Sequence, residues 1–377
     1  MGPLRGPFFI LNRPYYTHLL ADFLASFRDV HIIFNLFNYL TFRSAIAFIF
    51  SFLLTYFLLG WYIKSFRNKF YERVSEDVPE RHRKKEGTPS SGGLIFVPVA
   101  LISTLLWAKP VLEVLLAVIA TFVMGSMGFW DDISKLKRKD KKGGLRKTYK
   151  LLFQLGLGVL FSFGAVYIFG DKAFLTQFLF FKNFLINLGI LYFLFVAFVI
   201  AGTSNGVNLT DGLDGLATGV VIFPMAVLGI VAYIEGNFKF ANYLNLLYIQ
   251  NAGYLAVFAS SFLGSMIAFL WYNAHPAEVF MGDTGSQALG GALASLAVLT
   301  KQEVLLAIAG GVLVAETLSV AIQIGYFKLT GGKRFFKRAP LHHHFEELGW
   351  EESKIVVRFW IASLLFSLLA LSTLKIR

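Results

Sequence analysis

The chain has 377 residues, of which 56% are hydrophobic, and it carries a formal net charge of +12. Its mean hydropathy of +0.62 is too high for an ordinary soluble protein of this length. Cysteine is absent, which excludes disulfides and thiolate metal sites. In a membrane protein an excess of lysine and arginine reflects basic cytoplasmic loops beside anionic lipid, so the charge does not indicate a nucleic-acid partner.

The composition therefore predicts an all-α polytopic membrane protein. Residues 1–42 mix aromatic side chains with scattered arginines, and we assign them to an N-terminal periplasmic or interfacial segment, with 18–40 as a candidate amphipathic helix. Residues 43–377 are assigned to one transmembrane domain, because apolar runs long enough to cross a bilayer recur along them. Ten spans are expected, at residues 44–64, 93–108, 111–130, 151–170, 183–202, 216–234, 251–271, 286–300, 303–326 and 355–375.

Lysine and arginine are divided unevenly among the loops between these spans. The loops after spans one, three and nine are rich in them, whereas the loops after spans two, four, six and eight nearly lack them. Basic loops remain in the cytoplasm during insertion. The exits of the odd-numbered spans are therefore expected in the cytoplasm, with both termini outside.

Five unusual polar segments flank the apolar runs, and this orientation places all of them at the cytoplasmic face. They are residues 87–93, 128–135, 205–219, 273–285 and 338–346. Polar loops scattered by chance would not all choose one side of the membrane. The sequence therefore predicts a functional site at the cytoplasmic boundary.

Short carboxylates and amides dominate two of these segments. Asp131 and Asp132 are adjacent, while Asn208, Asp211 and Asp214 are spaced by three and would lie near one face of a helical turn. Alone, such residues indicate a solvated helix end, a loop or a helix cap. Together they are also the hard oxygen ligands that Mg²⁺ prefers, or groups that can accept a proton.

The other polar residues also allow two interpretations each. Asp283 lies among glycines and is either part of a plain turn or a metal ligand. Residues 342–344 are three histidines, either solvated or in contact with phosphate, sugar or metal. Phe280 is either an interfacial anchor or a platform on which a nucleobase stacks. Glu316, inside the ninth span, is either functional or a partnered structural carboxylate.

Taken together, the segments offer carboxylates for Mg²⁺, cations for phosphates and glycines that allow close approach. The lysine-rich run 135–150 would contact anionic lipid and also attract an anionic substrate. This combination is typical of phosphoryl transfer, in which catalysis consists mostly of positioning and charge neutralisation. The membrane boundary indicates one water-soluble and one lipid substrate.

Four motifs resemble the polyprenyl-phosphate sugar-1-phosphate transferases, over a region from about Thr88 to Glu346. They are Gly128-Phe-Trp-Asp-Asp-Ile-Ser-Lys135, Asn208-Leu-Thr-Asp-Gly-Leu-Asp-Gly-Leu-Ala217, Phe280-Met-Gly-Asp-Thr-Gly285 and Pro340-Leu-His-His-His-Phe-Glu346. The last motif is similar to that of the phospho-N-acetylmuramoyl-pentapeptide transferase family. This resemblance implies transfer of phospho-MurNAc-pentapeptide from its UDP carrier to undecaprenyl phosphate, giving lipid I and UMP, in peptidoglycan synthesis. It also implies Mg²⁺, ten helices, a homodimer and the bacterial cytoplasmic (inner) membrane.

The resemblance also implies roles for individual residues. Asp283 would hold Mg²⁺, with Asp131 and Asp132 beside the metal and the lipid phosphate. The nucleotide site would be lined by Asn208, Asp211, Asp214 and Phe280, with Phe280 stacked on uracil. The pyrophosphate or sugar would contact His342, His343 and His344, and supporting contacts would come from Lys84, Thr88 and Lys135.

Other functions and mechanisms remain as alternatives at this point. A sister transferase would use UDP-N-acetylglucosamine, although the histidine motif argues against it. A lipid or nucleotide-sugar transporter would place its polar residues near the membrane midplane, often with internal repeats. Transfer could proceed by direct attack of the lipid phosphate, which we favour because that phosphate is already largely ionised, or through a covalent aspartyl-phosphate.

Overall fold

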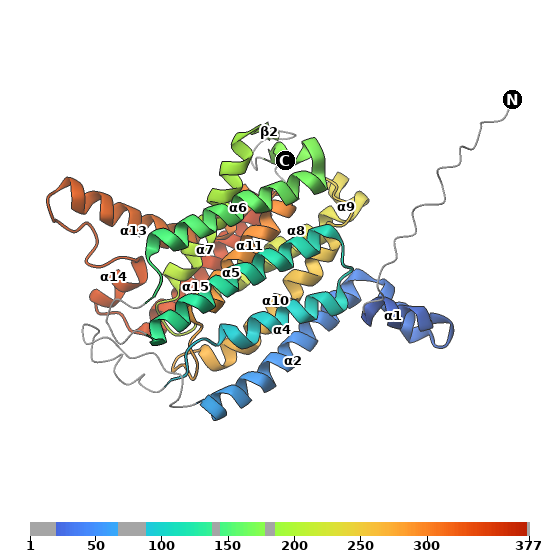
Figure 1. Cartoon of the computed structure of the whole chain (residues 1–377), viewed down its shortest axis with the longest axis horizontal. Coiled ribbons are helices and arrows are strands. Elements are labelled where there is room, and N and C mark those ends of the chain that lie inside the picture. Colours follow the sequence, from blue (N-terminus) through green and yellow to red (C-terminus); the bar gives the residue numbers. More distant parts are fainter. Residues whose placement is uncertain (1–19, 67–87, 138–143, 178–184, 375–377) are drawn as a thin grey trace.

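The computed structural model describes residues 20–66, 88–137, 144–177 and 185–374. Helices occupy each of the ten ranges in which spans are expected (Figure 1). Eight of them are long and apolar enough to cross a membrane. These are α2 (Leu40–Phe66), α5 (Leu112–Lys137), α6 (Lys147–Phe169), α7 (Leu191–Thr210), α8 (Leu216–Glu235), α10 (Ala252–Asn273), α13 (Gly311–Leu329) and α15 (Glu352–Thr373).

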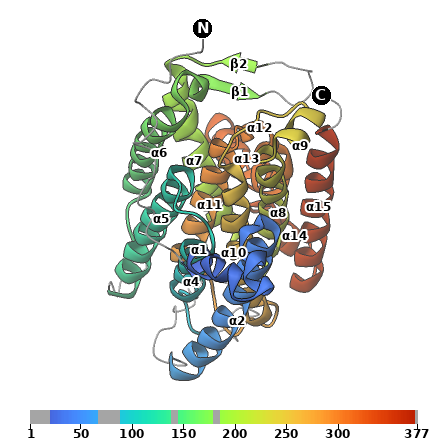
Figure 2. The same cartoon turned by 90° about the vertical axis from the view of Figure 1, so that its right-hand side faces the viewer.

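Helix α11 (Gly282–Leu299) is the centre of the bundle. Every residue from Asp283 to Leu299 is buried, and the helix packs against α5, α7, α8 and the 15-residue α4 (Gly93–Trp107). Because α11 meets protein on all sides, its serines and Gln287 are tolerated where a lipid-facing helix would need apolar side chains. The other helices surround it in Figures 1 and 2.

Glycines allow α11 to approach its neighbours closely. A Cβ on Gly93 of α4 would lie 2.3 Å from the backbone nitrogen of Gly285, and one on Gly128 of α5 would lie 2.2 Å from the carbonyl oxygen of Asp283. No side chain fits at either position. The beginning of α11 is therefore held directly against the backbones of α4 and α5.

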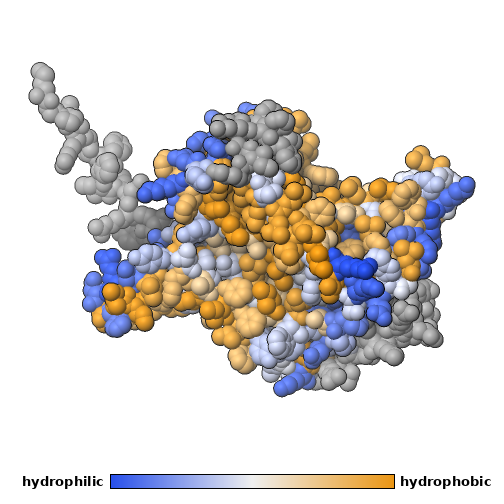
Figure 3. Space-filling model, turned by 180° about the vertical axis from the view of Figure 1, so that it is seen from behind, coloured by the Kyte–Doolittle hydropathy of each residue, from blue (hydrophilic) through white to orange (hydrophobic). Residues whose placement is uncertain are grey.

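The surface has the distribution expected of a membrane protein. Large apolar side chains are exposed along the outer helices, among them Tyr167, Phe198 and Trp271. Figure 3 shows apolar side chains over the middle of one face and hydrophilic side chains gathered toward its two ends. Burial in lipid explains why these side chains need no protein partner.

Three expected elements differ from the structure. The fifth span begins at Leu191, because residues 185–187 form strand β2 (Leu185–Asn187). This strand pairs antiparallel with β1 (Leu175–Gln177), which directly follows the short 3-10 helix η3 (Gly170–Phe174). Figure 2 shows this hairpin at one end of the bundle. The ninth span is interrupted at Gly310, which separates α12 (Glu303–Ala309) from α13.

The third difference concerns the N-terminal segment, where one amphipathic helix was expected. Its described part contains α1 (Leu20–Ser26), η1 (Phe27–Asp29) and η2 (Ile32–Asn38). Buried Arg43 of α2 pairs with Asp22 of α1 at 2.6 Å and donates to the carbonyl oxygen of Phe37. A buried guanidinium requires such partners, so the ion pair holds the segment against the bundle.

Two further short helices are α9 (Phe238–Tyr243) and α14 (Leu341–Glu347).

Candidate active site

Three carboxylates meet where α5 ends and α11 begins. Asp131 and Asp132 come from the last turns of α5, and Asp283 comes from the first turn of α11. One carboxylate oxygen from each lies within 4.8 Å of the others, and all three residues are buried. The contact exists because Gly128, one turn before Asp132, allows α5 to touch the backbone of α11. The sequence prediction that these three residues form one site is consistent with this geometry.

The carboxylate of Asp132 binds the N-terminus of α11. Its Oδ1 accepts from the backbone N–H of Asp283 at 2.9 Å, and its Oδ2 accepts from the N–H of Thr284 at 3.0 Å. The hydroxyls of Thr284 and Ser91 also donate to Oδ2, at 2.6 and 3.1 Å. The first N–H groups of a helix have no partner within it and favour a negative charge. Asp132 therefore fixes the position of α11 as well as contributing charge to the site.

Two lysines bridge the other two carboxylates. Nζ of Lys135 lies 3.1 Å from Asp131 and 2.8 Å from Asp283, and Nζ of Lys150 lies 2.7 and 2.6 Å from the same two carboxylates. Burial alone raises the pKa of Asp283, but Lys135 and Lys150 outweigh it and lower this pKa well below its usual range. The carboxylate of Asp283 is therefore ionised.

Lys150 is a site residue that the sequence analysis did not single out. It was counted only as part of a lysine-rich run, although it lies on α6 and reaches across to α5 and α11. The available signal was the acidic cluster itself, since three buried carboxylates require nearby cations.

The donors at this centre fit a divalent hard cation. Three carboxylates offer oxygen ligands, and Mg²⁺ prefers carboxylates together with water and substrate phosphates. With all groups ionised, the three carboxylates and two ammonium groups leave one net negative charge. If one lysine is displaced and a divalent ion takes its place, the charges at the centre balance. Asp131 and Asp283 would hold such an ion, because the oxygens of Asp132 are taken by the N-terminus of α11.

The residues that were predicted to line the nucleotide site do not all lie in one place. Asn208 lies at the acidic centre, where its side-chain amide donates to Oδ2 of Asp283 at 3.3 Å. Asp211 follows at the end of α7. Phe280 is half-buried, and its backbone pairs with the segment that follows Thr88, through the carbonyl of Pro89 and the N–H of Gly92. The loop that contains Thr88 is therefore placed beside Phe280.

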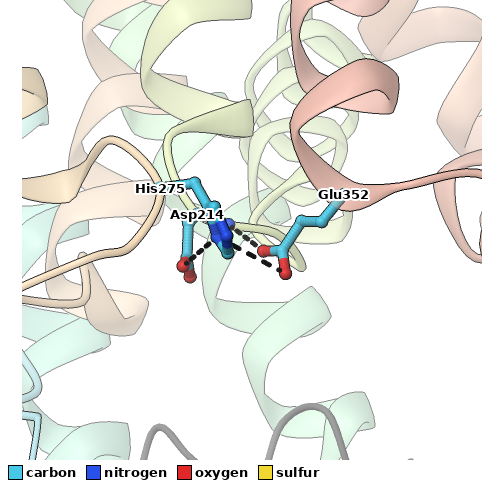
Figure 4. A group of neighbouring side chains, drawn as sticks. All are labelled: Asp214, His275 and Glu352. Carbon is cyan, nitrogen blue, oxygen red and sulfur yellow. Dashed lines mark hydrogen bonds and ion pairs between the residues drawn. The ribbon is translucent and has the colours of Figure 1, made fainter.

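Asp214 belongs to a separate group, shown in Figure 4. Its Oδ2 lies 3.1 Å from Nδ1 of His275, which is also 3.7 Å from Oε2 of Glu352. The backbone N–H of Asp214 donates to Glu352, so the group connects the loop after α7 to the start of α15. These three residues also have the donor types of a metal site. His275 and Glu352 were not predicted, because neither stands out in the sequence.

The three consecutive histidines have different hydrogen-bond partners. His342 is buried and pairs with Glu316 of α13. His343 pairs with Glu346 at 2.6 Å, and burial lowers the pKa of His343 although Glu346 opposes the shift. Nδ1 of His344 instead accepts from the N–H of Lys337. The ring centroids of His342 and His343 lie 4.2 Å apart, so these two imidazoles are neighbours although they pair with different carboxylates. Lys84 lies outside the described residues.

Comparison with known proteins agrees with this architecture. Residues 114–301, which include Asp131, Asp132, Asn208 and Asp283, match the model of Glycosyl transferase family 4. The helical bundle and the acidic centre thus define a membrane-embedded phosphoglycosyl transferase. The phospho-N-acetylmuramoyl-pentapeptide-transferase of Thermodesulfovibrio yellowstonii is 47% identical over 367 residues, covering 95% of this chain and all of that protein.

Two further relatives carry the same name. The protein of Desulfotalea psychrophila is 45% identical and covers 96% of this chain and all of its own length. The protein of Rickettsia prowazekii is 46% identical and covers 91% of this chain and 96% of its own length. The chain therefore belongs to the phospho-N-acetylmuramoyl-pentapeptide-transferase family, as its motifs predicted.

Proposed function

We propose that the acidic centre formed by Asp131, Asp132 and Asp283 is the catalytic centre of a lipid I synthase. The protein transfers phospho-MurNAc-pentapeptide from UDP-MurNAc-pentapeptide to undecaprenyl phosphate, and the products are lipid I and UMP. The observation that carries this assignment is the meeting of three buried carboxylates with two lysines, within a chain that belongs to this family. Carboxylates for a cation and ammonium groups for phosphates are the components of phosphoryl transfer.

We favour a single displacement. An oxygen of the lipid phosphate attacks the phosphorus that carries the sugar, and the bond from that phosphorus to the bridging oxygen breaks. UMP leaves with the bridging oxygen, so no proton is consumed. A phosphate has a second pKa of about 6 and needs no strong base at neutral pH. Asp131 and Asp283 therefore orient the reactants, while Lys135 and Lys150 stabilise the charge that develops on the phosphoryl oxygens.

Mg²⁺ is the proposed cofactor, with Asp283 as its principal ligand. When bound, the ion would neutralise the pyrophosphate and polarise the bond that breaks. The ammonium groups of Lys135 and Lys150, which now lie against Asp283, would then be free to contact phosphate oxygens. The acidic centre thus accounts for both metal binding and phosphate binding.

The nucleotide is assigned to the surface between the acidic centre and Phe280. Asn208 contacts Asp283 and Asp211 follows it at the end of α7, and Phe280 is proposed as the ring on which uracil stacks. Asp214 contacts the nucleotide from its group with His275 and Glu352. His342, His343 and His344 contact the pyrophosphate or the sugar, and Lys84 and Thr88 give supporting contacts.

The site is proposed to face the cytoplasm of a bacterial inner membrane, with ten spans, both termini outside and a homodimeric assembly. The excess of lysine and arginine in the loops after spans one, three and nine supports this orientation, because positive loops stay in the cytoplasm. Cytoplasmic placement also gives the site access to a UDP-linked donor, which is water-soluble, and to the phosphate of a lipid at the membrane surface.

The test follows UMP release by the purified protein from UDP-MurNAc-pentapeptide, undecaprenyl phosphate and Mg²⁺. Wild-type protein should release UMP only when lipid and metal are both present, and Asp283→Asn should abolish release. Asp29→Asn, at a side chain that is 91% exposed, is the matched control and should behave as wild type. Release from UDP-N-acetylglucosamine alone would instead establish the sister activity.

The covalent alternative has its own measurement. Wild-type protein is incubated with UDP-MurNAc-pentapeptide and Mg²⁺ without lipid, and its intact mass is recorded. A single displacement predicts an unchanged mass and no UMP. A stoichiometric increase by the phospho-sugar mass, discharged when undecaprenyl phosphate is added, would replace it with an aspartyl-phosphate mechanism.

A further inference from the structure

Glu316 and His342 form a buried pair between α13 and α14. Their side chains are 0% and 1% exposed. Oε1 of Glu316 accepts from the backbone N–H of His342 at 3.2 Å, and Oε2 lies 3.2 Å from Nδ1 of the same imidazole. A carboxylate can only accept hydrogen bonds, so Nδ1 of His342 carries the hydrogen in this pair.

The other ring nitrogen of His342 is buried and has no hydrogen-bond partner among the residues that the structure describes. It faces Gly212, at which an added Cβ would lie 2.3 Å from Nε2. Gly212 follows Asp211 in the loop between α7 and α8, and Asn208, one turn earlier, contacts Asp283 of the acidic centre. Nε2 is therefore directed at the backbone of the proposed nucleotide loop.

A purely structural pair does not account for this arrangement. Glu316 alone would suffice to hold α14, since it accepts both the backbone N–H and Nδ1. Leaving the second nitrogen buried and unpaired costs free energy, because it has lost its hydrogen bonds to water. A buried polar group without a partner needs an explanation, and a catalytic role is one such explanation. Glycine at position 212 also removes the side chain that would otherwise cover Nε2 permanently.

We propose that Glu316 is a positioning residue, which fixes the imidazole of His342 with its hydrogen on Nδ1 and directs Nε2 at the transferred phospho-sugar. This inference rests on the proposed function and extends it to a residue on α13 that touches no substrate. A carboxylate that orients an imidazole through Nδ1 determines which nitrogen is available for chemistry. A small displacement of the loop at Gly212, driven by the bound donor, brings Nε2 into contact with the substrate.

The test uses variants that separate orientation from structural support. Glu316→Gln keeps the shape and still accepts from the N–H of His342, but its amide donates to Nδ1 and moves the ring hydrogen to Nε2. His342→Asn keeps a donor near the position of Nδ1 and loses Nε2. We expect Glu316→Gln to unfold close to the wild-type temperature in detergent and both variants to stay folded at the assay temperature. KM for the UDP-linked donor should change less than about 2-fold, and kcat should fall at least ~10-fold.

Glu316→Asp retains the carboxylate and should recover part of the lost kcat, which a purely structural role would not produce. Glu347→Gln changes an exposed carboxylate on the same helix α14 and is the matched control, with wild-type kcat expected. Wild-type kcat in Glu316→Gln would overturn the proposal, and so would a loss of kcat that merely follows a lower unfolding temperature. Absence of UMP release by the wild-type protein would count against the proposed function instead, so the two failures are distinguishable.

Discussion

The most informative perturbation concerns Asp132, because two roles predict different results for it. If Asp132 only contributed charge to a metal site, Asp132→Asn would abolish activity and leave the fold intact. The structure predicts that the fold is weakened as well. In the wild type Oδ1 accepts one hydrogen bond from α11 and Oδ2 accepts three, from α11 and Ser91.

The magnitude follows from these four bonds. In the less damaging orientation, the new amide nitrogen replaces Oδ1 and faces the N–H of Asp283. A buried donor without an acceptor costs about 1–3 kcal/mol, and bonds to a neutral oxygen are each about 1 kcal/mol weaker than bonds to a carboxylate. Because burial of a charge is itself unfavourable, removal of the charge offsets part of this destabilisation. We therefore expect the free energy of unfolding to fall by about 2–4 kcal/mol.

The measurement is thermal unfolding in detergent, followed by tryptophan fluorescence, with UMP release recorded on the same samples. Thr284→Ser keeps the hydroxyl that donates to Asp132 and should unfold as wild type, whereas Thr284→Val should lose about 1–2 kcal/mol. An unfolding temperature for Asp132→Asn equal to that of the wild type would refute the anchoring role. Loss of activity alone would not support it, because a metal ligand predicts the same loss.

Two further predictions concern the same region. Lys150→Met removes the ammonium group that lies 2.7 Å from Asp131 and 2.6 Å from Asp283. Its kcat should fall by roughly 100-fold, while Lys150→Arg should retain more activity because it keeps the positive charge. Equal activity of the two variants would show that the charge is dispensable. Gly128→Ala places a Cβ 2.2 Å from the carbonyl oxygen of Asp283 and should lower the unfolding temperature and the yield of folded protein. Gly156→Ala is its control, because an added Cβ there would meet no atom of the described residues within 4 Å, and similar behaviour of both alanine variants would contradict the packing argument.

The sequence alone determined the class of the protein and predicted many residues of the proposed site. Long apolar runs can be stable only in lipid, so the helical ranges followed from hydropathy. Asp131, Asp132 and Asp283 were predicted to act together because polar, glycine-rich segments on one side of a membrane have a common chemistry. The family followed from motifs, which are local in the chain.

Tertiary structure decided which of these residues actually meet. The separation of Asp214 from the acidic centre depends on how α15 packs against α8, and periodicity within one segment carries no information about that. Lys150 reaches Asp131 and Asp283 only because α6 lies beside α5 and α7. Glu316 of α13 pairs with His342 of α14 although the two residues are 26 positions apart in the chain. Hydrophobic pattern specifies which face of a helix is buried, whereas close packing and hydrogen-bond geometry specify its partner.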